Sequence, residues 1–109
     1  MSAGLWLAIA IASEIAATSA LKLSDGFTRL VPGVVVVVGY AIAFYGMALA
    51  LRSMPLGIVY ASWSAVGTVG AVLVGRLVFG ESVQWPQVLG IVAVIGGVVL
   101  MNVSRGGVA

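Results

Sequence analysis

One acidic residue, Glu14, lies inside a long apolar stretch near the start of the chain. A charged group in the middle of a membrane span costs about 2.5–3.5 kcal/mol on insertion scales, so such a residue is functional by default. Removal from water disfavours the charged form, and a carboxyl group placed there can hold a proton in one state and a cation in another. The structural alternative is a protonated Glu14 that makes a hydrogen bond between helices, and both interpretations stay open.

Small residues surround Glu14 on its expected helical face. With 3.6 residues per turn, its neighbours on that face are Ala10, Ser13, Ala17 and Thr18. Small side chains leave the carboxylate uncovered and allow a second helix to approach closely. The two hydroxyls have alternative partners, either the site or a carbonyl of their own helix, and the sequence does not decide between them.

Aromatic residues occur in the two apolar stretches that follow. Trp63 lies too deep for an interfacial belt, and Tyr60, three residues earlier, shares its helical face. The preceding stretch adds Tyr40, Phe44 and Tyr45. A carboxylate with an aromatic wall can enclose an organic cation through charge pairing and cation–π attraction. A ring alone is more often a packing residue than a ligand contact, so only the combination with Glu14 predicts a site for an organic cation.

The composition identifies the medium in which these residues lie. Of 109 residues, 62% are hydrophobic and 7% are charged, whereas a soluble domain carries about 25% charged residues. Cysteine and histidine are absent, which excludes a disulfide framework and the commonest metal ligands. A net charge of +2 does not suggest a nucleic-acid partner. We expect no cofactor, no cleaved signal peptide and, without a nucleophile–base pair, no enzyme.

Four apolar stretches are long enough to span a bilayer, which takes about 17–25 residues each. They cover about residues 4–21, 32–51, 56–79 and 85–103. The run Val34 to Val38 resembles a strand, but it is part of a much longer apolar stretch, and lipid favours a helix there. Asp25-Gly26 is a turn signal, and Pro32 suits a first helical turn. The sequence predicts an all-α integral membrane fold, with residues 1–109 forming a single transmembrane domain.

The connections between these stretches are short, so consecutive helices are expected to be antiparallel with both termini on one side. Arg52 and Arg105 then lie on that side, and Lys22, Arg29 and Arg76 lie on the other. Because Lys and Arg are distributed almost evenly between the two sides, they give almost no orienting bias. The chain is therefore predicted to insert both ways round. In the last stretch, Gly90 and Gly97 lie seven residues apart on one face, which predicts packing in a dimer.

Several segments resemble a known family. They are Ala10-Ile-Ala-Ser-Glu14, Lys22-Leu-Ser-Asp-Gly-Phe-Thr-Arg29-Leu, Pro55-Leu-Gly57-Ile-Val-Tyr60-Ala-Ser-Trp63-Ser64-Ala-Val-Gly67 and the glycine-spaced last helix. The whole chain, without gaps, resembles the small multidrug resistance transporters, and it is most similar to their multidrug or quaternary ammonium branch.

This resemblance implies a homodimer of two oppositely inserted protomers in a bacterial inner membrane. The dimer would export lipophilic or quaternary ammonium cations in exchange for protons, with the proton gradient as its energy source. Glu14 matches the carboxylate that proton and cation share, and the binding-chamber aromatics correspond to Trp63, Tyr60 and Tyr40. Residues that match chamber-lining or hinge positions are Ala10, Ser13, Thr18, Ser64 and Gly67, and Ala17 joins them by its place beside Glu14. Gly90 and Gly97 match the dimer contact.

The alternative is the sister branch that exports guanidinium ions. Its members usually carry glycine at the position of Ala10, a tryptophan soon after the glutamate, and a lysine in the last helix. Here small residues follow Glu14, and the last helix ends in Met101-Asn102. One departure from the multidrug pattern is Ala65-Val66-Gly67, where the family often has Gly-Val-Gly at a kink.

Two other functions use similar features. A proton-conducting rotor subunit also relies on a lone intramembrane carboxylate, but it is typically a two-helix hairpin, and the four stretches and aromatic residues argue against it. A structural four-span scaffold would have no reason to keep Glu14 away from water. Binding of a quaternary cation in competition with protons would separate the transporter from both.

Overall fold

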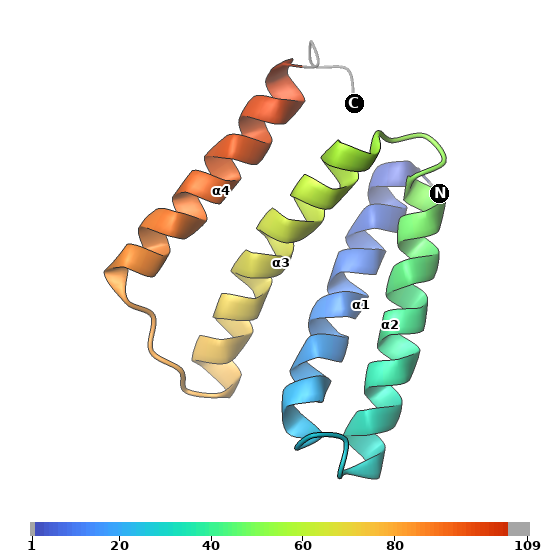
Figure 1. Ribbon diagram of the computed structural model, residues 1–109, viewed down its shortest axis with the longest axis vertical. Coiled ribbons are helices and arrows are strands. Elements are labelled where there is room, and N and C mark those ends of the chain that lie inside the picture. The colour runs from blue at the N-terminus through green and yellow to red at the C-terminus, as the bar shows by residue number, and fades with distance from the viewer. Residues whose placement is uncertain (1, 105–109) are drawn as a thin grey trace. The chain divides into compact units, whose positions relative to one another are not determined.

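A computed structural model describes residues 2–104, and each regular element in that range is an α-helix (Figure 1). The helices are α1 (Ala3–Leu23), α2 (Leu30–Ala50), α3 (Leu56–Val78) and α4 (Trp85–Ser104). All four are long and apolar enough to cross a membrane, and a helix bonds its own backbone groups, as lipid requires. The expected all-α chain with four spanning helices is confirmed. Arg105, which entered the charge comparison, lies outside the described residues.

The chain divides after Ser53 into two compact units. The first is the antiparallel hairpin of α1 and α2, and the second is the antiparallel hairpin of α3 and α4 (Figure 1). α2 begins at Leu30, two residues before the expected start, so Pro32 is its third residue. The lack of an N–H at Pro32 has no cost there, because the first N–H groups of a helix have no partner inside it.

The connection between α1 and α2 is organised by Ser24, which is fully buried. Its backbone N–H donates to the Ala20 carbonyl at 2.8 Å, and its hydroxyl donates to the Leu21 carbonyl at 2.7 Å. The same hydroxyl accepts from the Phe27 N–H at 3.1 Å. These bonds hold three successive left-handed residues, Asp25, Gly26 and Phe27, at φ +50°, +69° and +67°. Only Gly26 adopts that conformation without a steric cost.

α1 and α2 approach each other closely at two glycines of α2, Gly39 and Gly46. A Cβ atom added at Gly39 would lie 2.8 Å from Ala17 Cβ, and one added at Gly46 would lie 3.0 Å from Ala10 Cβ. The two glycines are seven residues apart on α2, and the two alanines are seven residues apart on α1, which is two helical turns in each case. Small residues on both helices therefore bring the two backbones together, the usual means of helix association in lipid.

The second hairpin turns at Gly80, which has a φ of +68°. The Gly75 carbonyl accepts hydrogen bonds from the N–H groups of Phe79 at 3.2 Å and Glu81 at 2.9 Å, and these bonds satisfy the end of α3. A left-handed glycine just past the last helical residues is a common helix ending. In the described chain, no residue of α4 is buried, so the faces of α4 are open to lipid or to another protein.

Candidate functional site

Three polar side chains of the first hairpin form a continuous hydrogen-bonded array. The Thr18 hydroxyl donates to Glu14 Oε1 at 2.8 Å, across one turn of α1. The same Thr18 oxygen lies 2.7 Å from the Tyr40 hydroxyl of α2. All three side chains are half-buried. The structure therefore answers the question left open for Thr18, because its hydroxyl contacts Glu14 and Tyr40 and not a carbonyl of its own helix.

The chemistry of the three groups sets the direction of this array. A hydroxyl has one proton to donate, and an ionised carboxylate can only accept. When Glu14 is ionised, the Thr18 hydroxyl donates its one hydrogen bond to Glu14, so the Tyr40 hydroxyl donates to the Thr18 oxygen. The carboxylate thus receives a bond that is itself polarised by a second hydroxyl, and bonds to charged acceptors are stronger than neutral ones. The array links the carboxylate of α1 to an aromatic residue of α2.

The first hairpin also has two ring contacts, one of which involves Tyr40 of the array. Tyr40 stacks on Phe44, one turn further along α2, with ring centroids 6.3 Å apart. Trp6 near the start of α1 meets Tyr45 edge to face at 6.0 Å. Both separations suit favourable aromatic pairs. Tyr40 is therefore oriented by its hydroxyl and by its ring together.

The small residues around Glu14 fall into two groups. Ala10 and Ala17 are fully buried, and their side chains face Gly46 and Gly39 of α2. Their packing role is thus visible, while a contact with a bound cation stays a prediction. Ser13 is half-buried, and its carbonyl lies 3.2 Å from the place of a Cβ atom at Gly39.

The other predicted chamber residues belong to α3, in the second hairpin. Tyr60 is 67% exposed, and Trp63 and Gly67 are half-buried. Ser64 is exposed, and its carbonyl accepts a hydrogen bond from the Thr68 hydroxyl at 2.6 Å. α3 is one continuous helix from Leu56 to Val78. Its exposed Tyr60 ring is available for a ligand or a partner helix.

The predicted dimer-contact residues, Gly90 and Gly97, lie on α4. A Cβ atom added at either position would meet nothing within 4 Å. Within residues 2–104, these glycines therefore serve no close helix contact, in contrast to Gly39 and Gly46.

The sequence reasoning missed Gly39 and Gly46, which set the spacing of α1 and α2. Their signal was present, since both are glycines seven residues apart in one predicted span, as Ala10 and Ala17 are in another. Among the described residues, no three or more His, Cys, Asp or Glu side chains lie close enough together to bind a metal ion. The chemistry of the first hairpin therefore centres on one carboxylate, two hydroxyls and aromatic rings.

Comparison with known proteins identifies the family. A family model described as Small Multidrug Resistance protein matches residues 3–94. The chain belongs to the small multidrug resistance family. Multidrug resistance protein EbrA of Bacillus licheniformis is 49% identical over 100 residues, which are 92% of this chain and 95% of that protein. Quaternary ammonium compound-resistance protein QacE of Escherichia coli is 44% identical over 102 residues, 94% and 93% of the two chains. QacF of Klebsiella aerogenes, with the same description, is 45% identical over 98 residues, 90% and 89% of the two chains.

These similarities confirm the resemblance first seen in the motifs. As a small multidrug resistance protein, the chain is a four-span membrane protein of a transporter family and not an enzyme. The family match over residues 3–94 spans α1, α2, α3 and the first half of α4, so the Glu14 array and the α3 aromatics both lie within the shared family region.

Proposed function

We propose that this protein is a proton-coupled antiporter that exports lipophilic or quaternary ammonium cations, with protons and cations competing for Glu14. The observation that carries the proposal is the Tyr40–Thr18–Glu14 array, which places a carboxylate of a membrane-spanning helix beside an aromatic residue. Relatives over 90% or more of the chain are named for resistance to multiple drugs and to quaternary ammonium compounds. Quaternary ammonium ions are cations that aromatic rings recognise through cation–π attraction, and a carboxylate adds charge pairing.

Competition at one carboxylate provides the coupling. With Glu14 ionised, an organic cation can pair with it, and the donated bond from Thr18 holds the carboxylate in position. With Glu14 protonated, the carboxyl group can donate a hydrogen bond to the Thr18 oxygen, and the Thr18 hydroxyl then donates to the Tyr40 oxygen. The array thereby reverses its direction when the proton arrives. Each ligand binds only after the other has left, and this mutual exclusion couples the two movements.

We further propose that the two hairpins act as a single transmembrane domain and that two chains assemble as an antiparallel homodimer. The even distribution of Lys and Arg supports insertion in both orientations. The open α4 face with Gly90 and Gly97 supports a helix contact between two chains. Tyr60 and Trp63 of α3, together with Ser64 and Gly67, would complete a chamber around two Glu14 side chains. Two oppositely oriented copies would provide the inverted symmetry that alternating access requires.

The test is gradient-driven transport in proteoliposomes. In the wild-type protein, a proton gradient is expected to drive a quaternary ammonium ion across the membrane in the direction opposite to the protons. Glu14→Gln is expected to lose this flux while retaining its helical content. Asp25→Asn is the matched control, because it makes the same carboxylate-to-amide change in the exposed α1–α2 connection, and asparagine tolerates the left-handed backbone there. Undiminished coupled flux in Glu14→Gln would refute the proposal.

The same assay with guanidinium as the transported ion distinguishes the multidrug branch from the sister branch that exports guanidinium. Quaternary ammonium flux that exceeds guanidinium flux supports the multidrug assignment. Guanidinium flux with no quaternary ammonium flux would leave Glu14 as the coupling residue but overturn the substrate class.

A further inference from the structure

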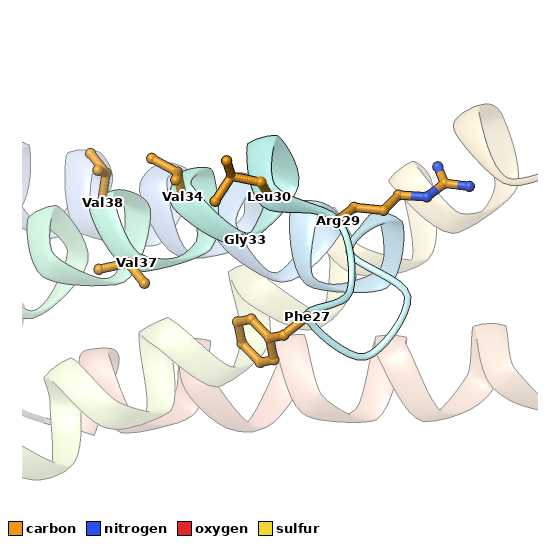
Figure 2. Close-up of a pocket in the computed structure, with 7 residues that line it drawn as sticks. All are labelled: Phe27, Arg29, Leu30, Gly33, Val34, Val37 and Val38. Atoms are coloured by element: carbon orange, nitrogen blue, oxygen red, sulfur yellow. The ribbon is translucent and has the colours of Figure 1, made fainter.

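A groove lies beside the first turns of α2, and none of the three residues of the Glu14 array lines it. It has a volume of about 360 Å³, and its lining comes from α2 and the connection before it. Apolar side chains such as Leu30, Val34 and Val38 form most of the wall, and the one charged residue is Arg29, where the helix begins. Figure 2 shows Phe27 turned back along α2, while the Arg29 side chain extends beyond the start of the helix. The groove therefore has an apolar body and a cationic end.

The position of Phe27 is imposed by the connection. Its left-handed backbone, at φ +67°, is a conformation that a bulky residue adopts only when its surroundings hold it there. The hydrogen bond from its N–H to the buried Ser24 supplies that restraint. Phe27 Cδ1 lies 3.7 Å from the place of a Cβ atom at Gly33, so the ring covers a part of α2 that has no side chain. Nevertheless Phe27 is 60% exposed, which leaves a large apolar ring accessible beside the groove.

The cationic end is reinforced by the helix itself. Arg29 is the N-cap residue of α2, and its side chain makes no capping hydrogen bond. The N–H groups of Leu30 and Val31 have no acceptor within the helix, because the first turn offers none. Those N–H groups and the helix dipole favour an anion close to Arg29. Asp25, the acidic residue of the same connection, is not among the residues that line the groove.

We propose that this groove binds one phospholipid with an anionic headgroup, with the headgroup phosphate at Arg29 and one acyl chain along α2 beside Phe27. From Leu30 to Val38 the helix rises about 12 Å, most of the roughly 15 Å depth of one leaflet's hydrocarbon. The cation lies at one end of this path and apolar side chains lie along the rest, which is the distribution of charge and hydrocarbon in a phospholipid. The site would be a feature of the protein's lipid surface, and it does not depend on the transport mechanism.

Crosslinking from within the groove tests the proposal. A photoreactive benzoylphenylalanine replaces Val37, which lines the groove and is 66% exposed. The protein is reconstituted in phosphatidylcholine vesicles that contain a minority of phosphatidylglycerol with the same acyl chains, and the adducts are identified by mass. We expect phosphatidylglycerol adducts to exceed the share of that lipid in the vesicle about five-fold, the effect of one arginine near the membrane surface.

Three variants divide the binding into its parts. Arg29→Gln is expected to reduce the enrichment to none, Arg29→Lys to retain most of it, and Arg52→Gln, an exposed arginine at the other end of α2, to leave it unchanged. Gly33→Leu fills the groove, and its Cβ meets only an ordinary van der Waals contact with Phe27. This variant is expected to lower adducts with both lipids.

Several outcomes would overturn the proposal. Equal labelling of the two lipids in the parent protein would remove the headgroup preference, and enrichment that persists in Arg29→Gln would assign it to another residue. Loss of the enrichment on addition of excess inorganic phosphate would show that the cationic end binds free phosphate and not a lipid. Adducts to a second protein chain in place of lipid would show that the groove is a protein interface.

Discussion

The close approach of α1 and α2 at Gly39 leads to a prediction for Gly39→Ala. A Cβ atom at this position would lie 2.8 Å from Ala17 Cβ and 3.2 Å from the Ser13 carbonyl oxygen. Carbon atoms pack at about 3.5–4.0 Å, so the two helices would have to separate locally by roughly 0.7–1.2 Å. Backbone atoms of α1 form part of the obstacle, and a change of rotamer cannot relieve it.

The expected loss of stability follows from two opposing effects. Overpacking of a tight contact costs about 1–3 kcal/mol, while replacing glycine by alanine inside a helix recovers about 0.5–1 kcal/mol. The net result is a loss of about 0–2.5 kcal/mol, centred near 1 kcal/mol. The separation also reaches the site, because Tyr40 follows Gly39 and Thr18 follows Ala17. The 2.7 Å contact between their hydroxyls would lengthen beyond hydrogen-bond range, and loss of one such bond corresponds to about five-fold weaker cation binding.

Thermal unfolding in detergent and binding of a quaternary ammonium ion measure the two effects separately. Gly33→Ala is the matched control, because it makes the same substitution in the same helix with only an ordinary contact, 3.7 Å from Phe27 Cδ1. It is expected to be as stable as the parent or slightly more so. Adding Ala17→Gly to Gly39→Ala removes the nearest obstructing atom and should recover part of both losses.

The reasoning would be refuted if Gly39→Ala unfolded and bound the cation like Gly33→Ala. It would also fail if Ala17→Gly worsened the defect of Gly39→Ala by its full single-mutant effect. Residues in contact are expected to show an interaction energy in such a cycle, and independent residues are not.

Two further substitutions test the array and the connection. Tyr40→Phe keeps the ring against Phe44 but removes the hydroxyl 2.7 Å from the Thr18 oxygen. It should weaken cation binding about five-fold with little change in unfolding temperature. Equal binding by parent and variant would show that the Tyr40 hydroxyl does not support cation binding. Ser24→Ala removes a buried hydroxyl that accepts from the Phe27 N–H and donates to the Leu21 carbonyl. A loss of about 1–3 kcal/mol in unfolding free energy is expected for the two bonds, measured in detergent, and an unchanged value would show that the connection does not rely on this side chain.

Much of the architecture could be predicted because a bilayer restricts the choices. Once the chain is too apolar and too poor in charge for water, each stretch of sufficient length must satisfy its own backbone as a helix. Composition and length therefore predicted four helices, and the observed ends differ by few residues. Glu14 could be singled out for the same reason, since a carboxyl group in the middle of a span is costly in lipid. Family membership followed from motifs that span the chain.

The tertiary structure decided how the individual side chains are used. Periodicity places Ala10, Ala17 and Thr18 near Glu14, but only the packing of α2 shows that the alanines meet glycines while Thr18 bonds to Tyr40. That distinction depends on the rotation and distance between two helices, which small atomic contacts determine and which a pattern within one helix does not contain. The left-handed backbone at Phe27 is likewise set by hydrogen bonds to Ser24. The sequence by itself determined the membrane helices and the carboxylate, and the contact between α1 and α2 determined what that carboxylate is bonded to.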